Sequence, residues 1–168
     1  YYDAVMDVTD KGLMNGAGGG KFAPNTNLTR GMAVTVLYRM SGETTGVAEE
    51  ATDAFSDVSA TQWYAEAVDW ASDNGIVKGS NGKFNPNTNI TRQDIATMMY
   101  RYAQYKQADT NQSADLGKYT DQGQISDYAL DSMEWAVAEG IISGRTQTTL
   151  VPRANLTRAE FATIISRY

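Results

Sequence analysis

The chain of 168 residues contains no cysteine and no histidine. Without cysteine it can form neither a disulfide framework nor a Cys-type zinc site, and it has no thiol nucleophile. Without histidine it lacks the usual general base and the commonest transition-metal ligand. We therefore expect no metal centre of these types and no catalysis that depends on either side chain.

Positive charge and long apolar runs are also scarce. The chain has 14 Lys and Arg against 20 Asp and Glu, which gives a net charge of −6 at pH 7, and the basic residues form no tract. Nucleic acid is not expected as a partner, because phosphate neutralisation requires clustered Lys or Arg. No apolar run reaches membrane-spanning length and no charged-then-apolar leader opens the chain, so we expect no membrane insertion.

Acidic residues do not gather in the pattern of a cofactor or hydrolase site. Asp57, Asp121 and Asp127 are isolated in the sequence, and no dense acidic loop has the spacing of a calcium site. Carboxylate pairs for glycoside hydrolysis are possible by residue type, but none recurs beside an aromatic cleft. We expect no cofactor and no enzyme, and a glycoside hydrolase stays only an alternative.

What the chain does contain is a turn that opens a helix, repeated three times. The copies occupy residues 25–32, 87–94 and 153–160 and read Asn-Thr-Asn-Leu-Thr-Arg-Gly-Met, Asn-Thr-Asn-Ile-Thr-Arg-Gln-Asp and Arg-Ala-Asn-Leu-Thr-Arg-Ala-Glu. The threonine before each arginine falls at position 29, 91 or 157, so the period is almost constant. A period of this length indicates three copies of one structural unit.

Each repeated turn carries its own signal for a helix start. Threonine is a favoured N-cap, because its hydroxyl accepts a hydrogen bond from a first-turn amide. Asp94 and Glu160 stand three residues after their caps, where a carboxylate can reach back to the cap amide, whereas Met32 cannot. The predicted caps are Thr29, Thr91 and Thr157.

Behind each cap, apolar residues recur with the spacing i, i+3, i+4, i+7. This spacing predicts an amphipathic helix of about four turns with one buried stripe. Three such helices need a shared core, and the simplest arrangement packs them against one another. The same interpretation places Trp70, Trp135 and the pair Met98-Met99 in the core. The predicted stripes are Ala33, Val36, Leu37 and Met40; Ile95, Met98, Met99 and Tyr102; and Phe161, Ile164, Ile165 and Tyr168.

A second helix is predicted ahead of each turn, and each of these helices ends in glycine, the usual left-handed helix stop. In the second copy the following Asn81-Gly82 pair predicts a tight turn, and Phe84 is expected to be a buried plug. The third copy lacks this glycine pair, so its loop is degenerate. The predicted helices are 1–12 ending at Gly12, 63–74 before Gly75, and 128–139 before Gly140.

These signals divide the chain into three repeats and two linkers. We assign residues 1–42 to an N-terminally truncated first repeat, 55–105 to the second and 119–168 to the third. The linkers, 43–54 and 106–118, are rich in polar residues, which is typical of solvated segments. Together the repeats predict one compact, mainly α domain of three helix-loop-helix units.

The middle copy carries a longer pattern that resembles a known family. It contains Phe-Ser-Asp-Val at 55–58, Trp63, Trp70, Gly-Ile-Val-Lys-Gly at 75–79, and the loop and turn up to Asp94. This string resembles the S-layer homology motif of bacterial surface proteins, whose signature ends in Thr-Arg-Ala-Glu. Residues 157–160 match that tetrad outright, and the resemblance covers nearly the whole chain apart from the linkers.

The resemblance implies a pseudo-threefold trimer of repeats around a central three-helix bundle. It implies a non-catalytic module, secreted, attached to the bacterial cell surface and monomeric when isolated. Its partner would be an anionic secondary cell-wall polysaccharide, often bearing ketal-pyruvate, which the family binds in grooves between neighbouring repeats. The family's essential arginine is the second residue of each tetrad, here Arg30, Arg92 and Arg158. Because Gly31-Met32 departs from Ala-Glu and the third loop lacks its glycines, the groove around Arg92 is expected to bind best.

The position of Arg92 is unusual on physical grounds alone. A basic side chain in the first turn opposes the positive end of the helix dipole, so something should offset the cost. A bound anion could do so through first-turn amides and a forked guanidinium contact. Trp63 could supply a sugar-stacking face beside it. The turn of the same repeat could supply donors through Gly79, Asn81, Gly82 and Lys83.

A structural interpretation of the arginines stays open. Each could pair with an acidic residue of the neighbouring repeat and fix the pose of the two repeats. The chain would then be a structural or protein-interaction module of a surface protein. The two interpretations differ in whether the guanidinium groups face an open groove or are held by intramolecular contacts.

Overall fold

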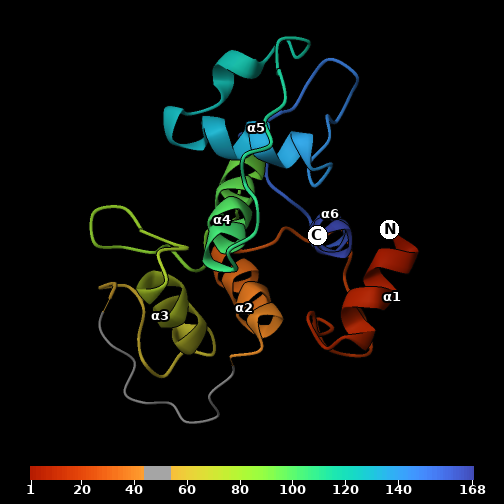
Figure 1. Cartoon of the computed structure of the whole chain (residues 1–168). Coiled ribbons are helices and arrows are strands. Elements are labelled where there is room, and N and C mark those ends of the chain that lie inside the picture. The colour runs from red at the N-terminus through yellow and green to blue at the C-terminus, as the bar shows by residue number, and fades with distance from the viewer. Residues whose placement is uncertain (44–53) are drawn as a thin grey trace.

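The computed structural model describes residues 1–43 and 54–168, and this part of the chain is mainly helical, as predicted (Figure 1). Most of the predicted linker 43–54 therefore lies outside the described residues. The described helices are α1 (Tyr2–Asp10), α2 (Arg30–Ser41), α3 (Ala65–Asp73), α4 (Arg92–Tyr105), α5 (Leu130–Ala138) and α6 (Arg158–Arg167), with short 3-10 turns η1 (Gln122–Gln124) and η2 (Asp127–Ala129).

The three predicted N-caps are confirmed. Each threonine hydroxyl accepts a hydrogen bond from the amide three residues on, at 3.2, 3.3 and 3.2 Å for Thr29, Thr91 and Thr157. Only α6 completes the capping box, because the Thr157 amide donates to Glu160 Oε2 at 2.8 Å. The predicted return of Asp94 to its cap is wrong: its carboxylate, one methylene shorter, contacts other partners described below.

The glycine stops are also confirmed. Gly12, Gly75 and Gly140 have φ of 68°, 70° and 70°, the left-handed conformation that glycine adopts without a Cβ clash. After each glycine, two successive amides turn back to one carbonyl in the last helical turn. For example, Ile76 and Val77 both donate to Ala71, at 2.8 and 3.2 Å. The sequence therefore defines where α1, α3 and α5 end.

The helices pair across repeats. α3 packs against α2, α5 against α4, and α1 against α6 (Figure 1). The first helix of a repeat therefore packs on the second helix of the preceding repeat, and the first repeat closes the cycle on the third. This interlocking explains why a single amphipathic helix-loop-helix unit has no complete core of its own.

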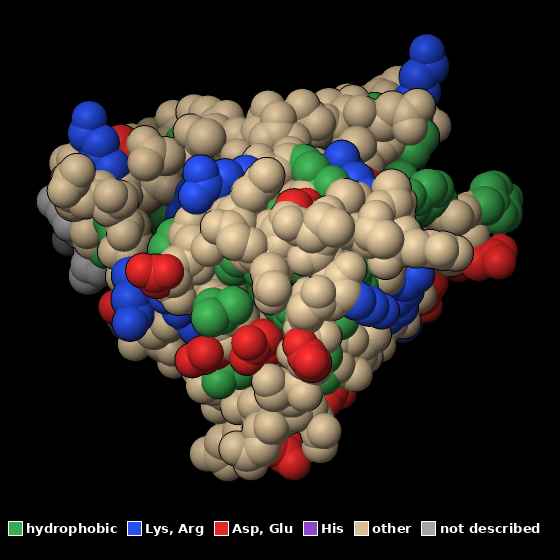
Figure 2. Space-filling model, turned by 90° about the horizontal axis from the view of Figure 1, so that it is seen from above, with side chains coloured by type: hydrophobic (Ala, Val, Ile, Leu, Met, Phe, Trp, Pro, Cys, Tyr) green, Lys and Arg blue, Asp and Glu red, His purple; other side chains and the backbone are tan. Residues whose placement is uncertain are grey.

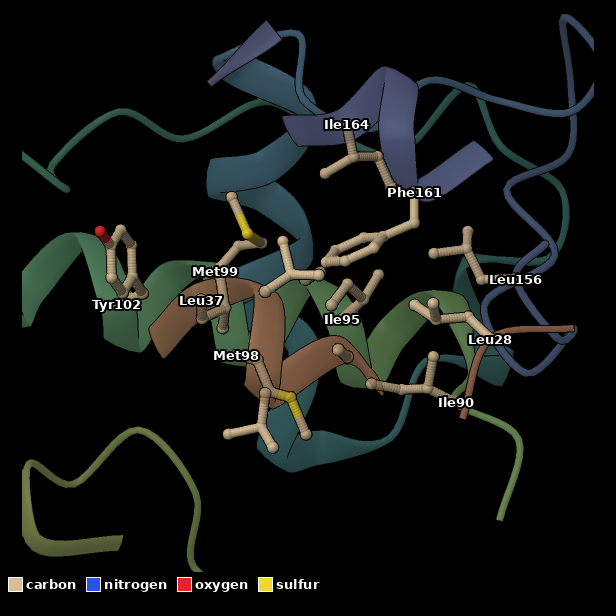
Figure 3. Packing of buried hydrophobic residues seen from close by; sticks show 14 of the residues in the cluster. Leu28, Leu37, Ile90, Ile95, Met98, Met99, Tyr102, Leu156, Phe161 and Ile164 are labelled. Atoms are coloured by element: carbon tan, nitrogen blue, oxygen red, sulfur yellow. The ribbon is translucent and has the colours of Figure 1, made fainter. Parts of the chain in front are cut away.

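A ring of three backbone hydrogen bonds joins the repeats at the helix caps. The Leu28 amide donates to Leu156 (2.8 Å), Leu156 to Ile90 (3.1 Å) and Ile90 to Leu28 (2.9 Å). All three side chains are fully buried and lie beside one another (Figure 3). The cyclic order supports the predicted trimer of repeats, while its threefold symmetry and central three-helix bundle stay predictions.

The core follows the predicted stripes with two exceptions. Met40 is only partly buried. Tyr168 is 42% exposed, so its predicted core position is wrong: it follows the last residue of α6, and its ring stands edge-on to Tyr102. Trp135 is buried, as predicted, and Trp70 packs partly buried against the core. The other ten stripe residues, Met98 and Met99 included, are buried (Figure 3).

The second-repeat loop forms the tight turn that Asn81-Gly82 predicts. Ser80 and Lys83 exchange backbone hydrogen bonds at 2.8 and 3.0 Å, and Asn81 and Gly82 have φ of 52° and 73°. This is the two-residue hairpin geometry that Asn-Gly favours. Phe84 follows the turn and is fully buried, as predicted.

Candidate functional site

Among the described residues, two grooves lie where the repeats meet. The first, of about 570 Å³, is bounded by Arg30 of the first repeat, the loop 76–85 and α4 of the second, and Tyr128 of the third. The second, of about 490 Å³, is bounded by Arg92 of the second repeat and by the loop 141–145 and α6 of the third, with Tyr1 at its edge. Side chains from all three repeats thus line each groove.

The tetrad arginines reach across the repeat boundaries. Each guanidinium donates through Nε to a carbonyl in the loop of the next repeat, in cyclic order. Arg92 and Arg158 each donate a second bond from Nη2, to Ser143 (2.5 Å) and to Asn15 (2.6 Å). The arginines therefore hold neighbouring repeats together through backbone carbonyls. The Nε bonds run from Arg30 to Phe84 (2.9 Å), from Arg92 to Leu150 (2.8 Å) and from Arg158 to Phe22 (2.9 Å).

Burial makes these carbonyl contacts important. Only 6% of Arg92 and 7% of Arg158 is exposed, and a buried charge is costly unless polar partners surround it. Burial lowers the pKa of the Arg92 guanidinium, and nearby Arg145 lowers it further. Burial likewise lowers the pKa of Arg30 and of Arg158. The carbonyl oxygens offset the cost of the cation at the helix start, a role for which the sequence also allowed a bound anion.

The first-turn amides are not open to a ligand, and this corrects the sequence-based expectation. In α4 the amides of Arg92 and Gln93 donate to the carbonyls of Ala154 (3.0 Å) and Pro152 (2.8 Å). The loop of the next repeat thus covers the helix start. The equivalent amides of α2 and α6 are bonded in the same way. These first-turn amides are therefore not free to bind an anion in the grooves.

Asp94 and Tyr128 connect all three repeats inside the first groove. The Tyr128 hydroxyl donates to Asp94 Oδ1 at 2.6 Å, and Asp94 Oδ2 lies 3.5 Å from Arg30 Nη1. Gln93 supports the tyrosine by donating to its hydroxyl at 3.2 Å. Burial, together with the hydrogen bond to Asp94, raises the pKa of Tyr128 to about 12. The tyrosine therefore stays a neutral donor at neutral pH.

The predicted ligand residues are divided between the grooves. Arg30, Gly79 and Lys83 line the first groove, whereas Arg92 lines the second. The predicted association of Arg92 with the turn of its own repeat is wrong, because each arginine crosses to the next repeat's loop. Ligand binding by any of these side chains stays a prediction.

Four predicted site residues lie outside both linings, among them Arg158, whose guanidinium reaches the carbonyls of Phe22 and Asn15 instead. Asn81 and Gly82 form the tip of the hairpin, and Trp63 is 61% exposed, with its ring edge-on to Tyr64. Trp63 precedes α3, which packs against α2, whereas Arg92 begins α4. It therefore does not provide the stacking face predicted beside Arg92. Tyr128 is the aromatic side chain with an exposed face at the first groove, since 58% of it is accessible.

Several lining cations were not singled out from the sequence. Lys78 and Arg101 line the first groove, and Arg145 and Arg167 the second. Arg101 and Arg167 stand at the same distance from their capping threonines as Arg39 does from Thr29. That recurrence could have identified them. Lys78 and Arg145 have no such signal, because the three loops differ in sequence.

Both grooves are basic although the chain is acidic overall. The first has four basic side chains and one carboxylate, and the second has three arginines and one carboxylate, against a net charge of −6 for the chain. Lys and Arg gather in separate groups on the surface, with Asp and Glu between them (Figure 2). The local field in the grooves therefore favours an anion.

Neither a metal cluster nor a membrane span is found among the residues that the structure describes. No group of three or more Asp and Glu side chains there could hold a metal ion. Within the same residues, no helix is both long enough and apolar enough to cross a bilayer.

Fold and grooves together define a class: a mainly helical domain of three interlocked repeats that meet at basic grooves. The S-layer homology domain family matches residues 1–33, 54–96 and 118–162, which takes in part of every repeat. The chain belongs to this family.

Its relatives include proteins of the cell surface. The chain is 30% identical over 169 residues to the Surface-layer 125 kDa protein of Lysinibacillus sphaericus and 28% identical over 161 residues to the Cellulosome-anchoring protein of Acetivibrio thermocellus. It is also 28% identical over 168 residues to the Amylopullulanase of Thermoanaerobacterium thermosulfurigenes.

These matches cover 98%, 92% and 97% of this chain but only 14%, 35% and 9% of the three relatives. The chain therefore corresponds to a small part of much longer proteins, and the activities of the whole relatives are not carried over to it.

Proposed function

We propose that the chain is a non-catalytic anchoring module that attaches a secreted protein to the bacterial cell surface. It would do so by binding an anionic wall polysaccharide in the grooves between repeats. Membership of the S-layer homology family and the surface-layer and anchoring relatives support the anchoring role. The observation that carries the proposal is the basic lining of both grooves in a chain of net charge −6.

The first groove has the chemistry that an acidic sugar requires. Lys78 and Lys83 offer flexible ammonium donors, Arg101 can fork onto a carboxylate, and Tyr128 presents an exposed ring for a sugar face. A carboxylate of the glycan, such as a ketal-pyruvate group, would be the anion. Binding in more than one groove of the same chain would add avidity to a modest affinity per groove.

A double substitution of the exposed lysines tests this assignment with little risk to the fold. Lys78→Ala with Lys83→Ala should lower affinity for purified wall polysaccharide at least about tenfold, because a charge-assisted hydrogen bond contributes about 1.5–3 kcal/mol. The matched control is Lys106→Ala with Lys118→Ala, which removes the same charge outside both linings. Isothermal calorimetry and co-sedimentation with walls provide the measurement. Equal binding by both double variants would refute the groove assignment.

Acid extraction of the wall separates the proposed partner from peptidoglycan. Co-sedimentation should disappear when the non-peptidoglycan polymer is removed from the walls. The purified polymer, added in solution, should inhibit binding of the protein to untreated walls. Unchanged sedimentation with extracted walls would show that the partner is another wall component.

The arginine contacts favour a second candidate function, a structural module in which these residues only join the repeats. Arg92→Lys keeps the charge but loses the forked contact to Leu150 and Ser143. If this candidate is correct, the variant melts at a lower temperature and wall binding stays proportional to the folded fraction. A loss of binding per folded molecule would instead assign Arg92 to the ligand.

A further inference from the structure

The guanidinium of Arg30 is held by contacts with Phe84 on one side and faces Asp94 across a long ion pair on the other. Its Nε donates to the Phe84 carbonyl at 2.9 Å, and its guanidinium carbon lies 5.0 Å from the centre of the Phe84 ring. Its Nη1 faces Asp94 Oδ2 at the long distance of 3.5 Å, and both side chains are partly exposed, at 18% and 25%. The guanidinium is therefore held in the first groove, while its ion pair with Asp94 is long.

Asp94 is not needed to cap its helix. In α6 the equivalent Glu160 accepts from the Thr157 amide at 2.8 Å and also pairs with Arg145 at 3.0 Å. The Asp94 carboxylate instead projects into the groove, where Tyr128 donates to it at 2.6 Å. The α4 cap persists without that carboxylate, because Thr91 accepts from the Asp94 backbone amide.

The remaining cations of the first groove form no ion pair among the described residues, although Arg101 interacts electrostatically with Asp94 and Lys83 with Asp57. Among the described residues, none of Lys78, Lys83 and Arg101 lies within ion-pair distance of an acidic side chain. An anion entering the groove thus meets four basic groups and one carboxylate, and that carboxylate repels it from Arg30.

We propose that Asp94 is an internal competitor for the anion position of the first groove. Its carboxylate occupies the open side of Arg30, and an anionic ligand binds Arg30 by exchanging with it. Asp94 thereby sets the anion affinity and the charge selectivity of this groove. The second groove is different, because the cap and Arg145 retain Glu160. This inference rests on the proposed function and names the residue that tunes it.

Asp94→Asn tests the proposal, because it removes the charge and keeps an oxygen that can accept from Tyr128. The probe is a galacturonic acid tetramer, with the uncharged galactose tetramer as its neutral counterpart. The readout is the ¹⁵N resonance of Arg30 Nε together with calorimetric affinity. We expect the affinity of the variant for the acidic probe to rise about threefold or more at low ionic strength, with no gain for the neutral probe.

Glu139→Gln is the matched control, since it changes net charge equally at the α5 C-cap, outside both linings. Its affinity should match that of the unchanged protein. Asp94→Ala provides a second variant without the carboxylate and should change affinity in the same direction. Equal or lower affinity in both Asp94 variants, or no shift of the Arg30 resonance in any of the proteins, would overturn the proposal.

The outcome is separate from that of the proposed function. If the unchanged protein fails to bind wall polysaccharide, the anchoring assignment fails, but the Arg30 titration still decides whether Asp94 competes with carboxylates. If wall binding is found and the Asp94 variants gain nothing, the anchoring assignment stands and the competitor role is wrong.

Discussion

At the scale of single residues, Gly79 shows how closely the first-groove loop is built. Its φ is +64°, and a Cβ there would lie 2.4 Å from Phe55 Cε1 and 2.6 Å from the Lys83 carbonyl oxygen. The position therefore excludes side chains twice, through backbone conformation and through space. The sequence suggests Gly79 as a donor in the turn but does not predict this close packing, because the approach of Phe55 depends on tertiary structure.

Gly79→Ala should destabilise the protein by about 2–4 kcal/mol, since it combines a left-handed backbone penalty with a clash against backbone and ring. Gly82→Ala is the control, because Gly82 has φ +73° but nothing within 4 Å of a Cβ. It should cost only about 1 kcal/mol. Urea unfolding followed by circular dichroism measures both, and equal losses would show that the clash is relieved by a shift of Phe55.

Two aspartates hold loops in a way that isolated positions in the sequence do not reveal. Asp57 accepts from the amides of Phe84 (2.9 Å) and Asn85 (2.8 Å), and Asp121 accepts from those of Leu150 and Val151. The loop residues Asn85 and Val151 have φ of 57° and 51°. These bonds compensate for a left-handed conformation before proline, which is most unfavourable for the β-branched Val151.

The same bonds predict a pH dependence. Burial alone would raise the pKa of Asp57, but the hydrogen bonds from the two amides outweigh it and lower the pKa below its usual value. The stabilisation is therefore complete above the unfolded pKa, near 3.8, and is lost as pH falls through the lower folded pKa. Asp57→Asn should lower Tm at pH 7, and the difference from the unchanged protein should shrink between pH 4 and pH 2. A Tm difference that stays constant over this range would contradict the ionised hydrogen bond.

At the scale of helices, two local signals, one for a helix start and one for a helix end, explain what the sequence could predict. The threonine caps and glycine stops fix where α2, α4 and α6 begin and where α1, α3 and α5 end, because both signals act within a few residues. The partner of each helix was not predictable. An apolar stripe shows that α3 is buried but does not show that α2, in another repeat, covers it.

For the site, too, local features could be predicted and tertiary partners could not. Sequence identified the three tetrad arginines from their recurrence, but not the direction in which they reach. The sequence-based interpretation combines Arg92 with the turn of its own repeat. In the fold it lies beside the loop that carries Leu150, because the loop of the following repeat covers each cap helix.

Glu160→Asp tests how much the complete capping box contributes to α6. The shorter side chain should lose the bond to the Thr157 amide, as Asp94 lacks one to Thr91, and should weaken the pair with Arg145. We expect a loss of about 0.5–1.5 kcal/mol in unfolding free energy. Glu139→Asp, at the exposed end of α5, should change it by less than about 0.5 kcal/mol. Denaturant titration compares the two, and no loss in Glu160→Asp would show that the reciprocal bond is not stabilising.

At the scale of the whole molecule, the cyclic pairing of helices should make unfolding cooperative. A linear repeat array can lose its end units one at a time, because each repeat contacts only its neighbours. Here every repeat has two neighbours, since α1 packs on α6. Removing any one repeat would expose apolar surface on both of the others.

We therefore expect one unfolding transition. Tryptophan fluorescence reports on the second and third repeats, where Trp63, Trp70 and Trp135 lie, and far-ultraviolet circular dichroism reports on all helices. The two signals should give the same midpoint and slope in urea. Separate midpoints would show that the repeats unfold as independent units.

The three backbone hydrogen bonds at Leu28, Ile90 and Leu156 form a closed ring. A circle of contacts has no first member, and α1 and α6, which carry the two chain ends, already lie against each other (Figure 1). A circularly permuted polypeptide, with its ends joined by a short peptide and a new opening in the segment 106–118, would meet the same set of neighbours. The fold therefore depends on which segments pack against one another and does not depend on their order along the chain.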